Sequence, residues 1–433
     1  MPEPATLAPT APDLINHARH RIALRLLPFL FTIYIFNYLD RTSVAYAAMG
    51  MTRDLGFSGR VFGLGVGIFF ISYVALQIPG ALLVERWSAR RLISLTMFAW
   101  GLTTSLTALV HTPAQLYFAR FVLGVAEAAF FPGVLVYLSH WFIDADRAKA
   151  SSNFMGAIPM SFILGSPIAG WVLGHSWLHI EGWRWLFIVE GIPAILLGGT
   201  AYFVLTDWPR EATWLLPEQR QWLEQKLREE APAKTESLTL GQALRLPAVL
   251  LLAAQTFFAY LVIYTFAFWF PTMLKSQSTL SYSSIGLLGA IPYIVTFLAM
   301  QFNGWHSDKT RERRWHSALP LLIAAVALLA LITLSRPQVE PLSLALMLFT
   351  LTCTAYSYLP AFWSMPSEIL SKSAAAAAVG MINGVGNIAG FAGPYLFGYL
   401  HDKTGTFSYG LGVMMLCAAM GGTLTLCVPR TAV

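Results

Sequence analysis

Long apolar runs alternate with short polar or charged turns along nearly the whole chain, and this alternation predicts membrane-spanning helices. A helix needs ~20 mostly apolar residues to cross the hydrocarbon core of a bilayer. Segments of this kind, separated by turns rich in Pro, Gly or charge, are expected at residues 26–49, 61–83, 92–110, 114–138, 150–174, 184–206, 247–270, 284–305, 316–334, 342–364, 374–399 and 407–428. The pattern predicts an all-α polytopic membrane protein with twelve transmembrane helices.

The longest polar stretch separates the predicted spans into two sets of six. We therefore expect an N-terminal tail, a six-helix bundle, a linker, a second six-helix bundle and a C-terminal tail. These parts are predicted at residues 1–25, 26–206, 207–246, 247–428 and 429–433, respectively. Within the linker, residues 214–230 predict an amphipathic helix that begins near Pro217 and lies on the membrane surface or caps the cytoplasmic ends of the spans.

The composition agrees with a membrane protein. Of the 433 residues, 56% are hydrophobic and 12% are charged, whereas soluble domains carry ~25% charged residues. Most of the 28 Lys and Arg residues lie in alternate loops, which predicts that both termini are cytoplasmic. The net charge of +6 is therefore a signal of membrane orientation and not of nucleic-acid binding. The first span is expected to act as its own targeting signal.

The sequence offers no pattern of catalytic chemistry. Cys353, Cys417 and Cys427 lie inside apolar runs without the spacing of metal ligands. The histidines form no HExxH motif, and there is no phosphate-binding GxxxxGK[ST] segment. We therefore predict no enzyme, no metal and no bound cofactor, and no use of ATP as a source of energy.

Ionisable residues nevertheless lie inside two predicted spans. Asp40 and Arg41 belong to the first span, and Arg120 and Glu127 belong to the fourth. A charge at this depth costs on the order of 3 kcal/mol, so each one needs a partner or a function. One interpretation is a structural ion pair that holds two helices together, and the other is a site for an anion and a proton. Because intramembrane ionisable residues are usually functional, we favour the second interpretation.

The two predicted halves contain matching motifs. An acidic residue followed by basic residues comes after the second span, at Glu85, Arg86 and Arg90, and after the eighth span, at Asp308 and Arg313. These loops resemble the cytoplasmic loop signature of the major facilitator superfamily, and the resemblance covers nearly the whole chain. It implies two six-helix bundles with a substrate site between them near the midplane. It also implies gating by the two charged loops and a monomeric protein.

A narrower resemblance is to the anion:cation symporter family of bacterial proton symporters for organic acids. Its main motifs here are Asn37-Tyr38-Leu39-Asp40-Arg41, Arg120 with Glu127, Gly182-Trp183-Arg184-Trp185 through Pro193, Phe362-Trp363, and Asn383 through Pro394. The segment Gly156-Ala-Ile-Pro159 is similar to tartrate, phthalate and hydroxyphenylacetate carriers, since sugar-acid carriers tend to have an amide there. The resemblance implies proton symport of a small organic carboxylate across the inner membrane.

Helix geometry gives the depth of each buried charge, and from these depths we assign expected roles. At ~1.5 Å per residue, Asp40 and Arg120 each lie about 9 Å from the outer edge of the hydrocarbon core, and Glu127 lies about 19 Å from it. The packing of the superfamily implies that the first and fourth spans are neighbours. We expect Arg41 to bind the substrate carboxylate through paired hydrogen bonds. Asp40 and Glu127 would then carry the proton, and Arg120 would be a mobile counter-ion of Asp40.

Other residues are expected to line the substrate path. Tyr38 shares a helical stripe with Arg41. Asn383 and Asn387 share one face of the eleventh span, where the neighbouring glycines allow another helix to approach closely. Amide hydrogen bonds between helices are the alternative role for this pair. The resemblance favours Asn383 and Trp363 as substrate contacts.

The remaining polar and proline positions support smaller expectations. Arg184 and Glu190, near the outer end of the sixth span, are expected to be structural, and Glu368 is expected to be a gate or loop contact. Interruptions that permit kinks are predicted at Pro159, Pro193 and Pro292.

Two other functions are compatible with the sequence. Gly165-Ser-Pro167 and Gly170 partly resemble the fifth-span motif of antiporters, which would fit a proton-driven exporter of amphipathic compounds. A membrane receptor would need an output domain, and no predicted loop is long enough to fold as one. The Asp40-Arg41 pair fits an anion better than an amphipathic cation, so the predicted function is import by proton symport.

Overall fold

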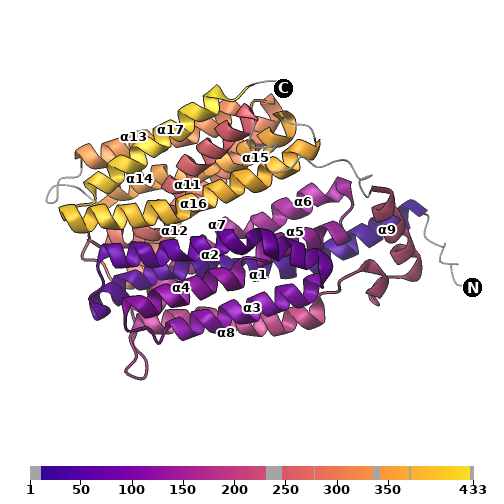
Figure 1. The fold of residues 1–433 in the computed structure, drawn as a ribbon, viewed down its shortest axis with the longest axis horizontal. Coiled ribbons are helices and arrows are strands. Elements are labelled where there is room, and N and C mark those ends of the chain that lie inside the picture. Colours follow the sequence, from indigo (N-terminus) through magenta and orange to yellow (C-terminus); the bar gives the residue numbers. More distant parts are fainter. Residues whose placement is uncertain (1–10, 231–245, 277, 335–341, 370–371, 430–433) are drawn as a thin grey trace, which may run out of the picture.

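The computed structural model describes residues 11–230, 246–276, 278–334, 342–369 and 372–429. Within these ranges the chain is almost entirely helical, and the helices run roughly side by side (Figure 1). Helices of the N-terminal half form one bundle, and those of the C-terminal half form a second bundle beside it. This arrangement confirms the predicted all-α membrane fold.

Each predicted span corresponds to one helix or to two consecutive helices. The first half contains α1 (Ala11–Leu55), α2 (Gly59–Arg86), α3 (Ala89–Thr107), α4 (Pro113–Glu127), α5 (Phe130–Trp141), α6 (Asp144–Met155), α7 (Ala157–Leu173) and α8 (Gly182–Val204). The rest of the chain contains α9 (Pro217–Glu230), α11 (Pro247–Ser276), α12 (Tyr282–Thr310), α13 (Arg314–Leu334), α14 (Leu342–Cys353), α15 (Leu359–Ile369), α16 (Lys372–Thr404) and α17 (Ser408–Cys427). By length and hydropathy, ten segments of the described chain qualify as membrane spans.

Proline explains why three predicted spans are each divided into two helices. The breaks after α4, α6 and α14 lie about one turn before Pro132, Pro159 and Pro360, respectively. A proline cannot donate a hydrogen bond to the carbonyl four residues earlier, and its ring clashes with that carbonyl. The interruption predicted near Pro159 is therefore confirmed. By contrast, α8 and α12 continue as helices through Pro193 and Pro292.

The N-terminal segment differs from the prediction of a polar tail over residues 1–25. The helix α1 already begins at Ala11. Arg19 makes two hydrogen bonds to Asp146 of α6, at 2.7 Å from Nε and 2.6 Å from Nη2. On the same helix, Ala18 and Ile22 are buried. Because these side chains find partners within the protein, the helix extends beyond its apolar part.

The linker helix α9 begins at Pro217, as predicted, and packs against the ends of the first bundle. Leu223 on its inner face is 1% exposed. Just before the helix, the Trp214 ring stacks on Trp141 of α5 with a centroid distance of 5.3 Å. Glu230 accepts a hydrogen bond of 2.7 Å from the backbone N–H of Asp144, which begins α6. Of the two predicted positions for this helix, the structure has the one that caps the spans.

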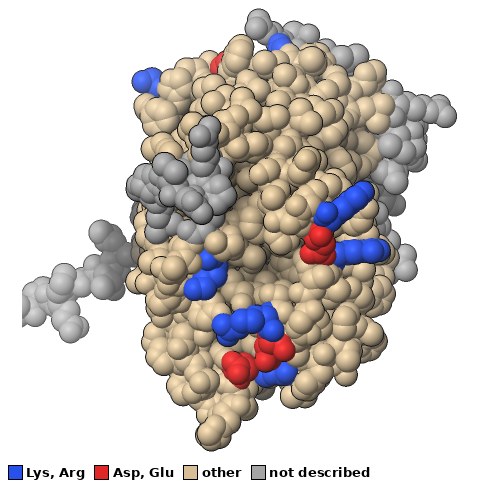
Figure 2. All heavy atoms as spheres, turned by 90° about the vertical axis from the view of Figure 1, so that its left-hand side faces the viewer, with Lys and Arg blue, Asp and Glu red and all other residues tan. Residues whose placement is uncertain are grey.

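The two halves meet closely at the end of the molecule away from α9, called the far end here, which carries the turns at 56–58, 108–112, 174–181 and 405–407. There α2 packs against α16, and α7 packs against α12. A Cβ atom on Gly63 would lie 2.4 Å from the carbonyl oxygen of Pro394, and one on Gly286 would lie 2.4 Å from that of Ser166. Only glycine allows these backbones to come so near. Figure 2 shows this end of the molecule, where charged side chains are few.

A carboxylate also joins the halves at the far end. Asp402 of α16 accepts hydrogen bonds from the backbone N–H groups of Gly59, at 2.8 Å, and Arg60, at 2.6 Å. These N–H groups belong to the first turn of α2 and have no partner within their own helix. Asp402 therefore caps a helix of the opposite half, which holds the far end closed in this structure.

Candidate functional site

An ion pair between Arg41 and Glu127 forms the centre of the candidate site. Arg41 Nη2 of α1 lies 2.7 Å from Glu127 Oε2 of α4, and Asn37 Nδ2 donates to the same oxygen at 3.0 Å. Arg41 is 5% exposed and Glu127 is 1% exposed. Within the described residues, Glu127 Oε1 has no hydrogen-bond partner. Glu127 thus pairs with the guanidinium group that is predicted to bind the substrate carboxylate.

Aromatic rings surround the guanidinium of Arg41. Its Cζ atom lies 5.1 Å from the centroid of Tyr38, 5.1 Å from that of Phe69 and 4.8 Å from that of Tyr73. A desolvated cation over an aromatic ring gains about 2 kcal/mol or more. The rings therefore stabilise the buried charge without using its hydrogen-bond donors, which stay available for a carboxylate.

Asp40 and Arg120 lie beside this ion pair but do not pair with each other. Asp40 accepts a hydrogen bond of 2.5 Å from Thr104 Oγ1 of α3. Arg120 Cζ lies 5.0 Å from the centroid of Phe69, the ring that Arg41 also contacts. In the part of the chain that the structure describes, no ion pair joins Arg120 to Asp40. The first and fourth spans do meet, as expected, but through other charges, and the counter-ion role of Arg120 stays a prediction.

The second half contributes polar and aromatic side chains. Tyr264 of α11 donates a hydrogen bond of 3.0 Å to Asn387 Oδ1 of α16. The Asn387 amide donates in turn to the carbonyl of Asn383 at 3.0 Å. Asn387 thus links α11 to α16 in this structure, and its substrate contact stays a prediction; Asn383 is half-buried. Trp363 of α15 is also half-buried, and it lies next to the hydroxyl of Tyr260.

Contacts across the halves bring these two groups of residues into one region. The rings of Phe70 in α2 and Tyr264 in α11 have a centroid distance of 4.7 Å. Phe70 also packs against Phe69 with a centroid distance of 5.1 Å, and Phe69 contacts the Arg41 guanidinium. The predicted substrate residues of the first half therefore face those of the second half across the bundle interface, although nothing here tests their roles.

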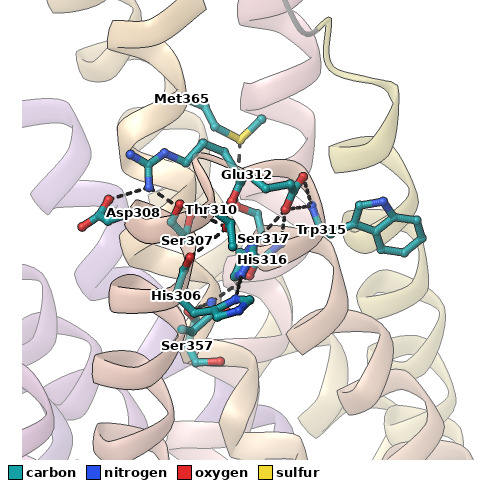
Figure 3. A network of polar contacts seen from close by, with 12 residues as sticks. His306, Ser307, Asp308, Thr310, Glu312, Trp315, His316, Ser317, Ser357 and Met365 are labelled. Atoms are coloured by element: carbon teal, nitrogen blue, oxygen red, sulfur yellow. Dashed lines mark hydrogen bonds and ion pairs between the residues drawn. The ribbon is translucent and has the colours of Figure 1, made fainter.

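The predicted gating residues of the second half, Asp308 and Arg313, form an ion pair at the loop between α12 and α13; Figure 3 shows Asp308 and its neighbour Ser307. Arg313 Nη1 donates to Asp308 Oδ1 at 2.6 Å and to Ser307 Oγ at 2.9 Å. Its Nε donates to Glu368 Oε1 of α15 at 2.9 Å. One arginine thus connects the end of α12, the start of α13 and α15, and Glu368 is the loop contact that the sequence suggests.

A second network in the same loop involves two histidines (Figure 3). His306 Nδ1 lies 2.6 Å from His316 Nε2, and His316 Nδ1 lies 2.7 Å from Glu312 Oε2. Glu312 also accepts the backbone N–H of Trp315 at 2.8 Å. Burial alone would raise the pKa of Glu312, but the hydrogen bonds from Trp315 and His316 outweigh it and hold this pKa below its ordinary value. No group of three metal-binding side chains occurs in the described ranges.

The corresponding loop of the first half is bonded to the start of the linker through Asp207. Asp207, at the start of the linker, accepts a hydrogen bond of 2.6 Å from Ser88 Oγ and one of 2.8 Å from the backbone N–H of Arg90. The Arg90 Nε atom lies 3.9 Å from the same carboxylate. The side chains of Glu85 and Arg86, also predicted to act in gating, lie outside the described residues.

Sequence reasoning missed Phe69, Tyr73 and Thr104, and it gave no role to Asn37. Phe69 and Tyr73 are four residues apart on α2, so their shared face was visible in the sequence. The sequence does not show that this face of α2 is rotated toward Arg41, because packing against the other helices determines the rotation. Thr104 is one of several hydroxyl residues in α3, and nothing local distinguishes it.

Comparisons with known proteins agree with this architecture. The sequence profile of the Major Facilitator Superfamily matches residues 30–394. An Agrobacterium vitis protein named "Putative tartrate transporter" is 39% identical, over 97% of this chain and 96% of the relative. The quinolone resistance transporter of Acinetobacter baumannii is 34% identical, over 93% of each chain.

A solved structure shows the same fold at low sequence identity. The bacterial homologue of the human lysosomal transporter Spinster superposes with a TM-score of 0.76 at 19% identity, covering 94% of this chain and 96% of the other. Together with the match of the sequence profile over most of the chain, the two bundles and the charged loops, this likeness fixes the family. The chain belongs to the Major Facilitator Superfamily and is a transporter rather than an enzyme.

Proposed function

We propose that this transporter imports a small organic carboxylate, tartrate-like or aromatic, together with a proton. The observation that carries the proposal is the buried pair of Arg41 and Glu127. Protonation of Glu127 removes the charge that occupies Arg41, and the freed guanidinium can then form paired hydrogen bonds to a substrate carboxylate. The printed name of the relative that is 39% identical supports a carboxylate as the substrate.

Both halves contribute to the proposed substrate site. Arg41 and Tyr38 hold the carboxylate, while Asn383, Asn387 and Trp363 contact the rest of the molecule from the second half. Tyr264 already bonds to Asn387 and packs against Phe70 of the first half, so it connects the two sets of contacts. Binding by both halves favours the state in which they close around the substrate.

The proton moves through the same cluster. Glu127 and Asp40 carry it, because each is buried and each has one carboxylate oxygen without a partner in the described residues. Arg120, whose Nε and Nη2 atoms also lack partners there, neutralises Asp40 when that residue loses its proton. No bound cofactor is needed, since the proton gradient supplies the energy.

Alternating access follows from the contacts between the halves. Because most Lys and Arg residues lie in loops at the α9 end, we assign this end and both termini to the cytoplasm. The far end then faces outward, in the inner membrane. Substrate enters when the contacts of α2 with α16 and of α7 with α12 separate. The loops held by Arg313 and Arg90 govern opening on the cytoplasmic side, and a monomer suffices for the cycle.

Uptake into proteoliposomes tests the proposal. A panel of radiolabelled tartrate, phthalate, hydroxyphenylacetate and nicotinate is offered with and without an inward proton gradient, to the wild type and to Arg41→Ala. We expect one acid to accumulate only with the gradient, and this accumulation to be lost in the variant. If no acid accumulates, or if accumulation ignores the gradient, the proposal is wrong.

One comparison favours a second candidate, a proton-driven exporter of amphipathic compounds. The relative that is 34% identical is named a quinolone resistance transporter. The aromatic side chains Tyr260 and Tyr264 would suit such substrates. Export of a fluorescent quinolone from inside-out vesicles, combined with no uptake of any acid, would establish this alternative.

A further inference from the structure

Glu190 of α8 is a buried carboxylate that the proposed mechanism does not use. It is 4% exposed, and its Oε2 atom has no hydrogen-bond partner in the described residues. No ion pair to Glu190 occurs in that part of the chain, and the nearby Arg184 bonds instead to the carbonyl of Ala108. Burying a carboxylate charge without a cation costs several kcal/mol. A charged carboxylate would need such a cation, so the absence of one favours a protonated Glu190.

The surroundings of Glu190 suit a protonated side chain. Glu190 and the Ser43 hydroxyl on α1 line the same small cavity. Ser43 already donates its proton to the backbone carbonyl of Asp40 at 2.8 Å. The Ser43 oxygen is thus left as an acceptor, which a protonated Glu190 can satisfy and a charged one cannot.

The cavity that Glu190 and Ser43 share is small. It has a volume of about 10 Å³ and is lined by Glu190, Ser43, Thr42 and Tyr46, together with Ser161 and Ser166 of α7. About 10–15 Å³ of such space holds one water molecule when polar partners are present. The cavity therefore has the size and the lining to seat a water that touches both Glu190 and Ser43.

Glu190 also lies on the outer side of Asp40. At ~1.5 Å per residue, Ser43 is about 18 Å and Asp40 about 22 Å from the far end of α1. Trp183 of α8 lies beside Gly50 and Asp54 of α1, so Glu190, farther along α8, is level with Ser43 and lies outside Asp40. Of the ionisable groups on the helices packed against α8, Asp40 lies about one turn deeper than Ser43 on α1, and Tyr46 lines the same cavity as Glu190. Glu190, Ser43 and Asp40 therefore form a path from the far end toward the central cluster.

We propose that Glu190 is the outer proton relay of this transporter, which receives a proton from the far end and delivers it to Asp40. Glu190 in its acid form gives its proton to a water in the cavity, and that water gives a proton to the Asp40 carboxylate. Glu190 is left as a carboxylate and takes its next proton from the outside solution. The inference rests on the proposed proton symport, and it assigns a transport role to a residue for which the sequence suggests a structural one.

The test compares two activities of Glu190→Gln in proteoliposomes, with radiolabelled tartrate as the probe. Exchange of external for internal tartrate needs no net proton movement, whereas accumulation driven by the gradient does. We expect exchange close to the wild-type rate, and a loss of about 100-fold in gradient-driven uptake, the lower range for a positioned proton-transfer group. Glu190→Asp should restore part of the driven uptake.

Controls separate this inference from the proposal on which it rests. Glu181→Gln removes an exposed carboxylate just before the same helix and should leave both activities unchanged. Ser43→Ala removes a hydroxyl that lines the cavity and would hold the relaying water, without removing a charge. It should impair driven uptake more than exchange, and it provides the test if Glu190→Gln fails to fold. Wild-type driven uptake in Glu190→Gln, or equal loss of both activities in Ser43→Ala, would overturn the relay alone. A wild type that shows no driven uptake of any acid overturns both proposals.

Discussion

Arg41 and Glu127 are each stabilised chiefly by the other, and this mutual dependence can be measured. Removing one member of a buried ion pair leaves an unpaired charge and typically costs about 3–5 kcal/mol. We therefore expect Glu127→Gln to lower the free energy of unfolding in detergent by this amount. Adding Arg41→Met to Glu127→Gln should recover part of the loss. Thermal unfolding of the four proteins in the cycle gives the coupling energy.

The chain contains a suitable control for this cycle. Arg19 and Asp146 form an ion pair of similar length, but their side chains are 38% and 25% exposed. Exposed pairs contribute about 0–1 kcal/mol. The corresponding cycle with Arg19→Met and Asp146→Asn should therefore show little coupling, and comparable coupling in the two cycles would contradict the importance of burial at Arg41.

The charge of Arg41 is not sufficient for its proposed role. Its planar guanidinium donates to Glu127 while its face contacts three rings, and lysine reproduces neither the fork nor the stacking. We expect Arg41→Lys to keep the fold but to reduce substrate uptake at least about tenfold, equivalent to 1.4 kcal/mol of lost binding. Equal uptake by the two proteins, measured at matched amounts in liposomes, would show that a point charge is enough.

Counting residues placed the buried charges in the first and fourth spans but did not predict which of them meet. It put Asp40 and Arg120 at one depth and Glu127 about 10 Å deeper, whereas Glu127 bonds to Arg41 in the structure. The direction in which each side chain points depends on the rotation of its helix, which long-range packing sets. For this reason the pairing of Arg41 with Glu127, and the contact of Asp40 with Thr104, emerged only from the structure.

Glycine contacts between helices control the closure of the far end. In Gly63→Leu, the new side chain would collide with the backbone of Pro394, which is part of α16 and cannot yield easily. We expect this variant to favour a state that is open at the far end. Spin labels on His111→Cys and Thr406→Cys, in a background with Cys427→Ser, should lie several ångströms farther apart than in the parent, a shift typical of rigid-body transitions.

Gly199 provides the matched control for this distance measurement. A Cβ atom there would meet no neighbouring atom within 4 Å. Gly199→Leu should therefore leave the distance between the labels unchanged. If both leucine variants give the distance of the parent, the close contact of α2 with α16 does not decide whether the far end is closed.

The loop before α13 depends on a single carboxylate. Glu312 accepts the free N–H groups of Trp315 and His316, as a helix cap does, and we expect Glu312→Ala to cost about 1 kcal/mol of stability. Because these bonds lower the pKa of Glu312, its contribution is present at neutral pH and is lost as the pH falls through that lowered pKa, below ~4.3. Unfolding temperatures of the two proteins should therefore differ at pH 7 and converge near pH 3. A difference that persists in acid would contradict the role of the charge.

At the scale of elements, apolar periodicity predicted every helix, and most errors occurred at breaks and ends. The pattern could not show that α1 begins at Ala11, because that polar segment is stabilised by Asp146, a partner far away in the sequence. The prolines at the three breaks were visible, but Pro193 and Pro292 show that a proline alone does not interrupt a helix. Neighbouring helices decide between the two outcomes.

The whole molecule has an approximate internal symmetry that the repeated motifs anticipate. The second and eleventh spans meet as α2 and α16, and the eighth and fifth meet as α12 and α7. The second and eighth spans hold equivalent places in the two halves, and so do the fifth and eleventh. The two contacts are therefore counterparts of each other. This correspondence is what a duplicated six-helix unit predicts, and it gives the transporter two equivalent contacts to open and close.

Membrane orientation can be tested with the intact protein in cells. We assign α9 to the cytoplasm and the turn at 108–112 to the outside, on the basis of the Lys and Arg distribution. A membrane-impermeant thiol reagent should label His111→Cys in intact cells and Gln221→Cys only in inside-out vesicles. Both positions are exposed, so neither result would reflect burial. The opposite pattern of labelling would reverse the assignment of the far end to the outside.

The central claim of this account is that a substrate carboxylate replaces Glu127 on Arg41 when Glu127 takes up a proton. The most direct test is the affinity for tartrate, or for the acid that accumulates in the uptake panel, measured by calorimetry across a range of pH. Binding to the wild type should weaken as the pH rises, because charged Glu127 competes for Arg41. Binding to Glu127→Gln should be tight and nearly independent of pH, whereas the same pH dependence in both proteins would contradict the claim.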